Sequence, residues 1–125
     1  MYSTGISSTL TVFHAMRGDF GQEAHPHFHP YLVEWTIDTD KVDANGFATD
    51  ISAMEEALQE QVAELGGTFL NTLPFFREAQ TSLENLARFL HGELTRRLHE
   101  RNVDTGTAMQ IRIWESENAW ASYRA

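Results

Sequence analysis

The chain contains no cysteine among its 125 residues. Disulfide bonds, thiolate zinc ligands and a cysteine nucleophile are therefore excluded. A reducing compartment is compatible with this composition, and we expect a cytoplasmic protein.

A long apolar run is also missing. No stretch of about 18 apolar residues occurs, and the first residues lack the basic segment and apolar core of a secretory signal. We therefore expect neither a signal peptide nor a membrane span.

Basic residues are scarce, with 9 Lys and Arg against 18 Asp and Glu and a formal net charge of −9. Neutralising phosphates requires clustered basic side chains, so a nucleic-acid partner is disfavoured, as is an anionic membrane surface. A small anionic substrate in a local pocket remains compatible. The length fits one domain over residues 1–125, and the 42% apolar content is sufficient for an ordinary core.

Hydrophobic periodicity divides the chain into strands and helices. Alternating apolar positions predict strands, and apolar steps of three or four predict helices. The expected strands are Gly5–His14, His27–Ile37 and Met109–Trp114, and the expected helices are Ser52–Leu65 and Ser82–His99. Residues 15–26 are expected to form a loop, residues 47–49 a short strand end, and residues 120–123 a segment that pairs with the sheet or covers it. This order of elements is typical of the α+β class.

Both expected helices begin with a capping-box pattern. Ser52 with Glu55 fits the start of the first helix, and Thr81 with Glu84 fits the start of the second. Gly66-Gly67 is expected to end the first helix.

Histidines are concentrated near one strand start. His27 and His29 are two residues apart, so in a strand their side chains point the same way. His14 ends the preceding strand, and pairing of the two strands would bring it beside them. Three imidazole nitrogens leave the fourth position of a tetrahedral ion open, which is typical of catalytic zinc.

Other interpretations of the histidines remain open. His25 competes with His29 as third ligand, although Pro26 interrupts the strand register there and favours the pair His27 and His29. Because a bare His-x-His pattern is weak, surface or loop histidines without a metal are the alternative. The second helix carries two more histidines, which we interpret as surface residues: His91 and His99.

Two carboxylates are candidate functional groups. Glu23 lies four residues before His27 in the expected loop and is a candidate general base. Its alternative is a solvated loop carboxylate. Glu115 follows the last strand and is a candidate anchor for a ligand with adjacent N–H donors, or else a surface charge at a strand end.

These motifs together resemble the family of 6-pyruvoyl-tetrahydropterin synthase and its bacterial relative 6-carboxytetrahydropterin synthase, over nearly the whole chain. Leu10-Thr-Val-Phe-His14 is similar to the family's strand that ends in a zinc histidine. His27-Phe-His29-Pro-Tyr31 is similar to its His-Gly-His-x-Tyr motif, with Phe28 expected on the opposite strand face from the ligands. An alternative alignment places Arg17 at the ligand position of His14, but His14 restores the ligand with a shorter following loop.

Further segments follow the family's order. The matching segments are Gly46-Phe-Ala-Thr-Asp50 before the first helix, Leu70-Asn71 after it, Thr81-Ser-Leu-Glu84-Asn-Leu-Ala87 at the second helix, and Glu115-Ser116 after the last strand.

The chain departs from the family at its catalytic positions. The family's cysteine, four residues before the His-x-His pair, is replaced by Glu23. Its Asp-His pair is replaced by Gly66-Gly67. Some members with glutamate at the cysteine position are linked to side-chain cleavage toward 6-hydroxymethyl-dihydropterin.

The resemblance implies a fold and an activity. The fold is the tunnelling fold, an antiparallel four-stranded sheet with two helices on one face, whose sheets join into a barrel in a trimer or hexamer. The activity is a zinc-dependent lyase reaction on a dihydropterin such as 7,8-dihydroneopterin triphosphate. The implied roles are zinc binding by His14, His27 and His29, general-base catalysis by Glu23, and substrate binding by Glu115, Ser82 and Glu84.

Two other functions are compatible with the sequence. A zinc or pterin binder of the same fold without lyase activity is favoured by Gly66-Gly67, because the assisting Asp and His are absent. An acidic α+β interaction domain without metal is the third possibility.

Overall fold

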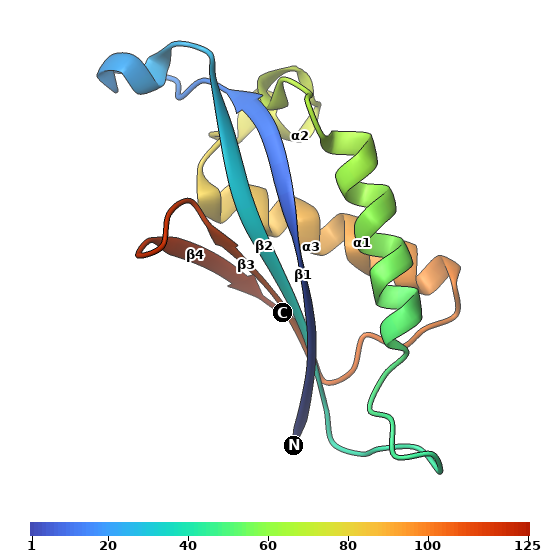
Figure 1. Cartoon of the computed structure of the whole chain (residues 1–125). Coiled ribbons are helices and arrows are strands. Elements are labelled where there is room, and N and C mark those ends of the chain that lie inside the picture. Colours follow the sequence, from blue (N-terminus) through green and yellow to red (C-terminus); the bar gives the residue numbers. More distant parts are fainter.

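A long antiparallel hairpin dominates the molecule, which the computed structural model describes over all residues 1–125 (Figure 1). Its strands continue into a shorter second pair, giving one antiparallel sheet with the order β1-β2-β3-β4. The strands are β1 (Tyr2–His14), β2 (His27–Thr39), β3 (Ala108–Trp114) and β4 (Trp120–Arg124). The three predicted strands are thus confirmed, and the tail after Trp114 pairs with the sheet.

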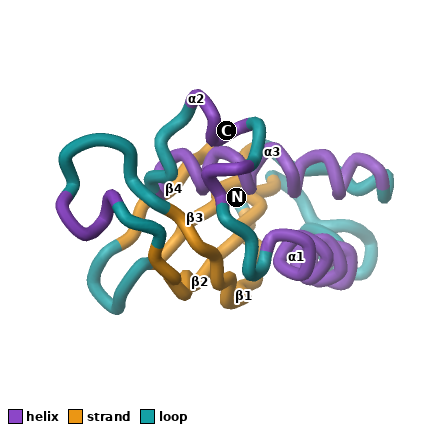
Figure 2. Tube along the Cα trace, turned by 90° about the horizontal axis from the view of Figure 1, so that it is seen from above, coloured by secondary structure: helices purple, strands orange, loops and turns teal.

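Two long helices lie together on one side of this sheet (Figure 2). α1 packs along β1, and α3 packs against β3 and β4. The helices are α1 (Ile51–Leu65), the single turn α2 (Phe75–Glu78) and α3 (Leu83–Glu100), with short 3-10 turns at Gly21–Ala24 and Leu70–Thr72. The α+β class and the two-layer arrangement agree with the prediction. No helix combines the length and apolarity that crossing a membrane requires.

The helix caps differ from the predicted capping boxes. The side chain of Asp50 accepts a bond from the Ala53 N–H at the start of α1, and that of Ser82 accepts one from the Asn85 N–H at the start of α3. Thr81 does not cap, because its hydroxyl donates instead to the Ala15 carbonyl across the molecule. The predicted strand end at residues 47–49 is also wrong, since that segment is irregular.

The core lies between the sheet and the two helices. We call this side of the sheet the covered face; its buried strand residues are Leu10, Val12, His14, Tyr31, Val33, Trp35, Ile37, Met109, Ile111 and Ile113. Their strict alternation along each strand is the signal that made the strands predictable. The same alternation continues from the apolar core to His14, His27 and His29, so the core itself orients the histidines.

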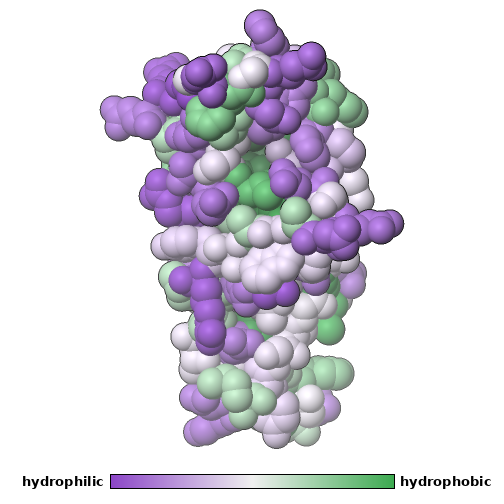
Figure 3. Space-filling view, turned by 90° about the vertical axis from the view of Figure 1, so that its left-hand side faces the viewer, coloured by the Kyte–Doolittle hydropathy of each residue, from purple (hydrophilic) through white to green (hydrophobic).

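The other side of the sheet, the open face, carries the intervening residues. Phe28 is 57% exposed there and packs on Phe13, with ring centroids 4.9 Å apart. The predicted orientation of Phe28, away from the histidines, is therefore confirmed. The Arg112 guanidinium lies 3.8 Å from the ring centroid of the exposed Trp120. Figure 3 shows a side of the molecule with mixed purple and white side chains and a small apolar recess in its upper half.

The chain beyond β1 is pinned by side chains distant in sequence. Asn71 accepts a hydrogen bond from the Ala15 N–H at 2.9 Å and donates one to the Ala15 carbonyl at 2.8 Å. Gln80 makes the same pair of bonds with the backbone of Arg17, at 2.9 and 2.8 Å. These bonds place the turn that follows His14.

Replacing Asn71 with leucine should destabilise the protein by about 1–3 kcal/mol, because two half-buried backbone groups of Ala15 lose their partner. Urea unfolding measures the change. The exposed Asn118 offers a control, since Asn118→Ala should stay within about 0.5 kcal/mol of wild type. Equal urea midpoints for Asn71→Leu and wild type would contradict the stabilising role of Asn71 in this turn.

Candidate metal and substrate site

Three histidine side chains meet where β1 ends and β2 begins. His14 pairs directly with His27 in the β1–β2 register, and their ring centroids are 4.3 Å apart. His29, one pleat further along β2, lies 6.3 Å from each of the other two rings. The structure therefore brings together the three histidines that the sequence selected.

The hydrogen bonds of these rings define their tautomers. In each ring Nδ1 faces a backbone carbonyl: that of Thr81 for His14 at 3.1 Å, of His25 for His27 at 2.9 Å, and of Pro30 for His29 at 3.2 Å. Because a carbonyl only accepts, Nδ1 must donate its proton in every case. Each neutral ring then presents an unprotonated Nε2, which is the arrangement of a metal-binding histidine held by a carbonyl behind it.

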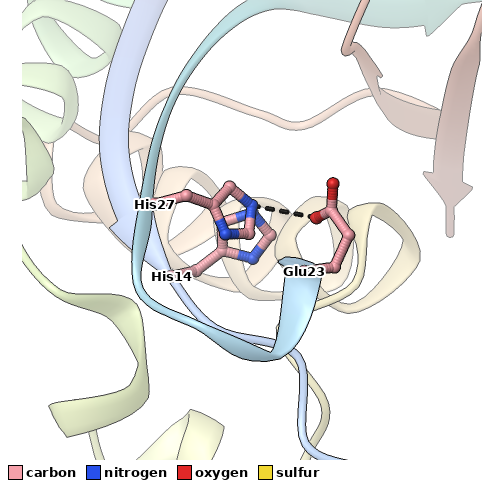
Figure 4. Close-up of side chains that lie close together, drawn as sticks. All are labelled: His14, Glu23 and His27. Carbon is pink, nitrogen blue, oxygen red and sulfur yellow. Dashed lines mark ion pairs between the residues drawn. The ribbon is translucent and has the colours of Figure 1, made fainter. Parts of the chain in front are cut away.

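Glu23 joins the histidines through the fold of the preceding loop. The Met16 N–H donates to the Glu23 carbonyl at 2.7 Å, which folds the short 3-10 turn back onto β1. Figure 4 shows the Glu23 side chain directed at His27, and its Oε2 lies 2.9 Å from Nε2 of that ring. The ligand atoms of His14, Glu23 and His27 all lie within 4.8 Å of one another. His29 lies beside this group of three, outside that limit.

The surroundings of the His27 Nε2 atom indicate whether the site suits a metal ion. It is buried and has no hydrogen-bond partner, although the Glu23 carboxylate is close to it. An unprotonated nitrogen and a carboxylate oxygen both present lone pairs, so they repel unless a cation or proton is present. The three Nε2 atoms and the Glu23 carboxylate form a donor set that fits zinc, which binds histidine nitrogen and carboxylate oxygen.

His14 is the most enclosed of the three ligand candidates. It is 5% exposed, and Thr81 contacts its Nδ1 through both the carbonyl and the hydroxyl. Burial, reinforced by the neighbouring His27, lowers the pKa of His14 below that of a free histidine. A lowered pKa keeps the ring neutral, as metal binding requires.

Tyr31 belongs to the site although it is not among the predicted site residues. Its hydroxyl lies 3.1 Å from His14 Nε2, and its ring stacks on His29 at 4.5 Å between centroids. Burial, followed by the charges of Glu115 and Glu23, raises the pKa of Tyr31. Tyr31 lies two residues after His29 in the same strand, so its side chain points to the same face of the sheet as the histidines. This spacing is the feature of the sequence that could have indicated its place in the site.

The predicted substrate-binding residues lie at the end of β3 and at the start of α3. Glu115 is exposed after β3 and lines a recess of about 620 Å³ together with open-face residues such as Thr9 and Leu32. Ser82 directly follows Thr81, which contacts His14, and its own hydroxyl caps α3. Glu84 is exposed in the first turn of α3.

The remaining candidates lie apart from the candidate ligand nitrogens. His25 contributes its carbonyl to His27 while its side chain is exposed, and the Arg17 guanidinium donates to the Ala79 carbonyl. His99 is exposed as predicted. The surface interpretation of His91 is wrong, because its ring is half-buried and lies 3.0 Å from the Met109 carbonyl.

Gly66-Gly67 lies against the free edge of β1. The Gly67 N–H donates to the Thr11 carbonyl at 2.8 Å, and the positive φ of 75° at Gly67 suits glycine. Two residues on, Phe69 forms a parallel bridge with Phe13. The pair therefore ends α1 and aligns the next segment with the strand that carries His14.

A family model described as 6-pyruvoyl tetrahydropterin synthase matches residues 6–125. No curated protein sequence matches the chain. Among solved structures, the 6-pyruvoyl tetrahydropterin synthase of Caenorhabditis elegans superposes with a TM-score of 0.83 at 14% identity, covering 99% of this chain and 95% of the other. A Plasmodium vivax variant, in which a glutamate named as a catalytic residue is replaced by alanine, gives 0.77 at 15% identity over 99% and 97%. The Plasmodium falciparum protein gives 0.73 at 16% identity over 98% of both chains.

Proposed function

The chain belongs to the 6-pyruvoyl tetrahydropterin synthase family, and from this premise we propose that it is a zinc-dependent lyase acting on a dihydropterin such as 7,8-dihydroneopterin triphosphate. The observation that carries the proposal is the convergence of histidine nitrogens and a carboxylate at one end of the sheet. A cation bound there would hold together the buried His27 Nε2 atom and the Glu23 carboxylate, which lie 2.9 Å apart.

His14, His27 and His29 would hold the zinc ion. Zinc bound there supplies a Lewis acid beside the substrate's hydroxyl groups. The carbonyls of Thr81, His25 and Pro30 fix the three rings, so the chain presents the ligands before any ion arrives.

Glu23 is the proposed general base. Its carboxylate adjoins the histidines and is largely exposed, so a substrate can reach it. Accepting a proton from the substrate's side chain would start elimination or retro-aldol cleavage. The similar Plasmodium vivax protein, in which a glutamate is named as a catalytic residue, favours this assignment.

Glu115 is the proposed anchor for the pterin ring. A carboxylate accepts two parallel N–H bonds from an amino-pyrimidine edge, which fixes the orientation of the ring. After burial, the charge of Glu115 raises the pKa of Tyr31, whose hydroxyl lies beside His14. Ser82 and Glu84, at the start of α3, would line the same substrate site.

We also propose that the chain acts as a homotrimer or hexamer. The exposed apolar side chains of Phe13, Phe28, Leu32 and Trp120 favour a contact with a second copy, because burying them in a subunit interface is favourable. The open face of one sheet alone leaves these groups in water.

The direct test is turnover by the purified protein. We expect about one zinc per chain by elemental analysis and consumption of 7,8-dihydroneopterin triphosphate by HPLC. Bound zinc without turnover of several pterins would favour the alternative, a zinc or pterin binder without lyase activity. Absence of both would favour the acidic interaction domain.

Glu115→Gln should raise KM for the pterin about 10- to 100-fold, because glutamine cannot accept the two ring N–H bonds as an anion. Glu78→Gln removes a charge from the exposed end of α2 and serves as the matched control. Steady-state kinetics measures both variants. Equal KM values in Glu115→Gln and wild type would remove Glu115 from the substrate site.

A further inference from the structure

Tyr31 contacts two of the three candidate zinc ligands while its ring belongs to the core. It is 3% exposed, and it extends from β2 on the covered face, one pleat beyond His29. Its hydroxyl lies 3.1 Å from His14 Nε2. Its ring stacks on His29 with an interplanar angle of 12°. Tyrosine at this position therefore restrains both rings at once.

The contact of His14 Nδ1 determines which group donates the hydrogen bond between Tyr31 and His14. Nδ1 donates to the Thr81 carbonyl, so Nε2 of the neutral ring carries no proton and can only accept. The Tyr31 hydroxyl must then be the donor. Its proton occupies the same lone pair of His14 that would bind a metal ion.

We propose that Tyr31 is a positioning residue that holds His14 Nε2 in the metal-free protein and gives up this nitrogen when zinc binds. The inference rests on the zinc site of the proposed function and adds to it a residue that sets the metal affinity. Because the hydroxyl and the ion compete for one lone pair, the hydrogen bond weakens zinc binding while it stabilises the empty site.

Tyr31→Phe tests this competition, because it removes the hydroxyl and keeps the ring that stacks on His29. Zinc should bind about 3- to 10-fold more tightly, the equivalent of one neutral hydrogen bond, in competition with a chromophoric chelator. The melting temperature of the metal-free variant should fall by a few degrees. Tyr123→Phe is the matched control, since Tyr123 packs edge-on against His91 away from the cluster.

The outcomes separate this inference from the proposed function. A wild-type chain that binds no zinc overturns the proposed function, and the inference falls with it. A wild-type chain that binds zinc, together with an equal or weaker affinity in Tyr31→Phe, overturns the inference alone. Tighter zinc binding together with a lower metal-free melting temperature supports it, because a merely structural tyrosine would lower stability without strengthening the metal site.

Discussion

Glu23→Gln is expected to lower kcat for the dihydropterin by about 10²- to 10⁴-fold, the usual contribution of a general base. The amide is nearly isosteric with the carboxylate, so the turn around Met16 and the contact with His27 should survive while the basic oxygen is lost. HPLC of product formation gives the rate, and elemental analysis of the same samples gives the zinc content. We expect zinc to remain at the wild-type level.

The zinc measurement makes this prediction specific. A loss of zinc together with the rate would make Glu23 a ligand, as its place within 4.8 Å of the His14 and His27 nitrogens allows. Unchanged turnover would remove it from the mechanism. Asp19→Asn changes the charge of the same loop at an exposed position and should leave both quantities unchanged.

The covered face shows why the fold was predictable. Val33, Trp35 and Ile37 alternate with polar residues, and the same parity extends back to His27 and His29. A register shift of one residue would turn the apolar side chains and the histidines together toward the open face. The buried apolar residues therefore also fix the face on which the histidines lie. A local pattern was therefore sufficient to place the ligand candidates.

The rest of the site depends on contacts that a local pattern does not contain. The position of Glu23 relative to His27 is set by the backbone bond from Met16, and the turn after His14 is set by Asn71 and Gln80. The capping box predicted at Thr81 was wrong for the same reason, because the Thr81 hydroxyl has a partner in a segment distant in sequence. These partners are 63 to 66 residues apart for Gln80 and Thr81, so no helix or strand periodicity relates them.

His27→Ala is expected to leave almost no bound zinc after dialysis, with a fall in affinity greater than about 100-fold, since even the loss of a residue behind a ligand costs about 10- to 100-fold. His27 carries the buried Nε2 that lacks a partner, and its ring lies nearest to His14. Elemental analysis and chelator competition measure the effect. His99→Ala, an exposed change on α3, should keep full occupancy.

Zinc measurements on variants of neighbouring residues identify the third ligand. His29→Ala should also lose zinc, because its Nδ1 is held by the Pro30 carbonyl and its Nε2 is left free. His25→Ala should retain zinc, because only its backbone carbonyl contacts His27. Full occupancy in His29→Ala, combined with loss of zinc in Glu23→Gln, would instead assign the site to His14, Glu23 and His27, the group whose ligand atoms already lie closest together. In that case the base would have to come from another residue, because one carboxylate cannot serve the ion and the substrate proton equally well.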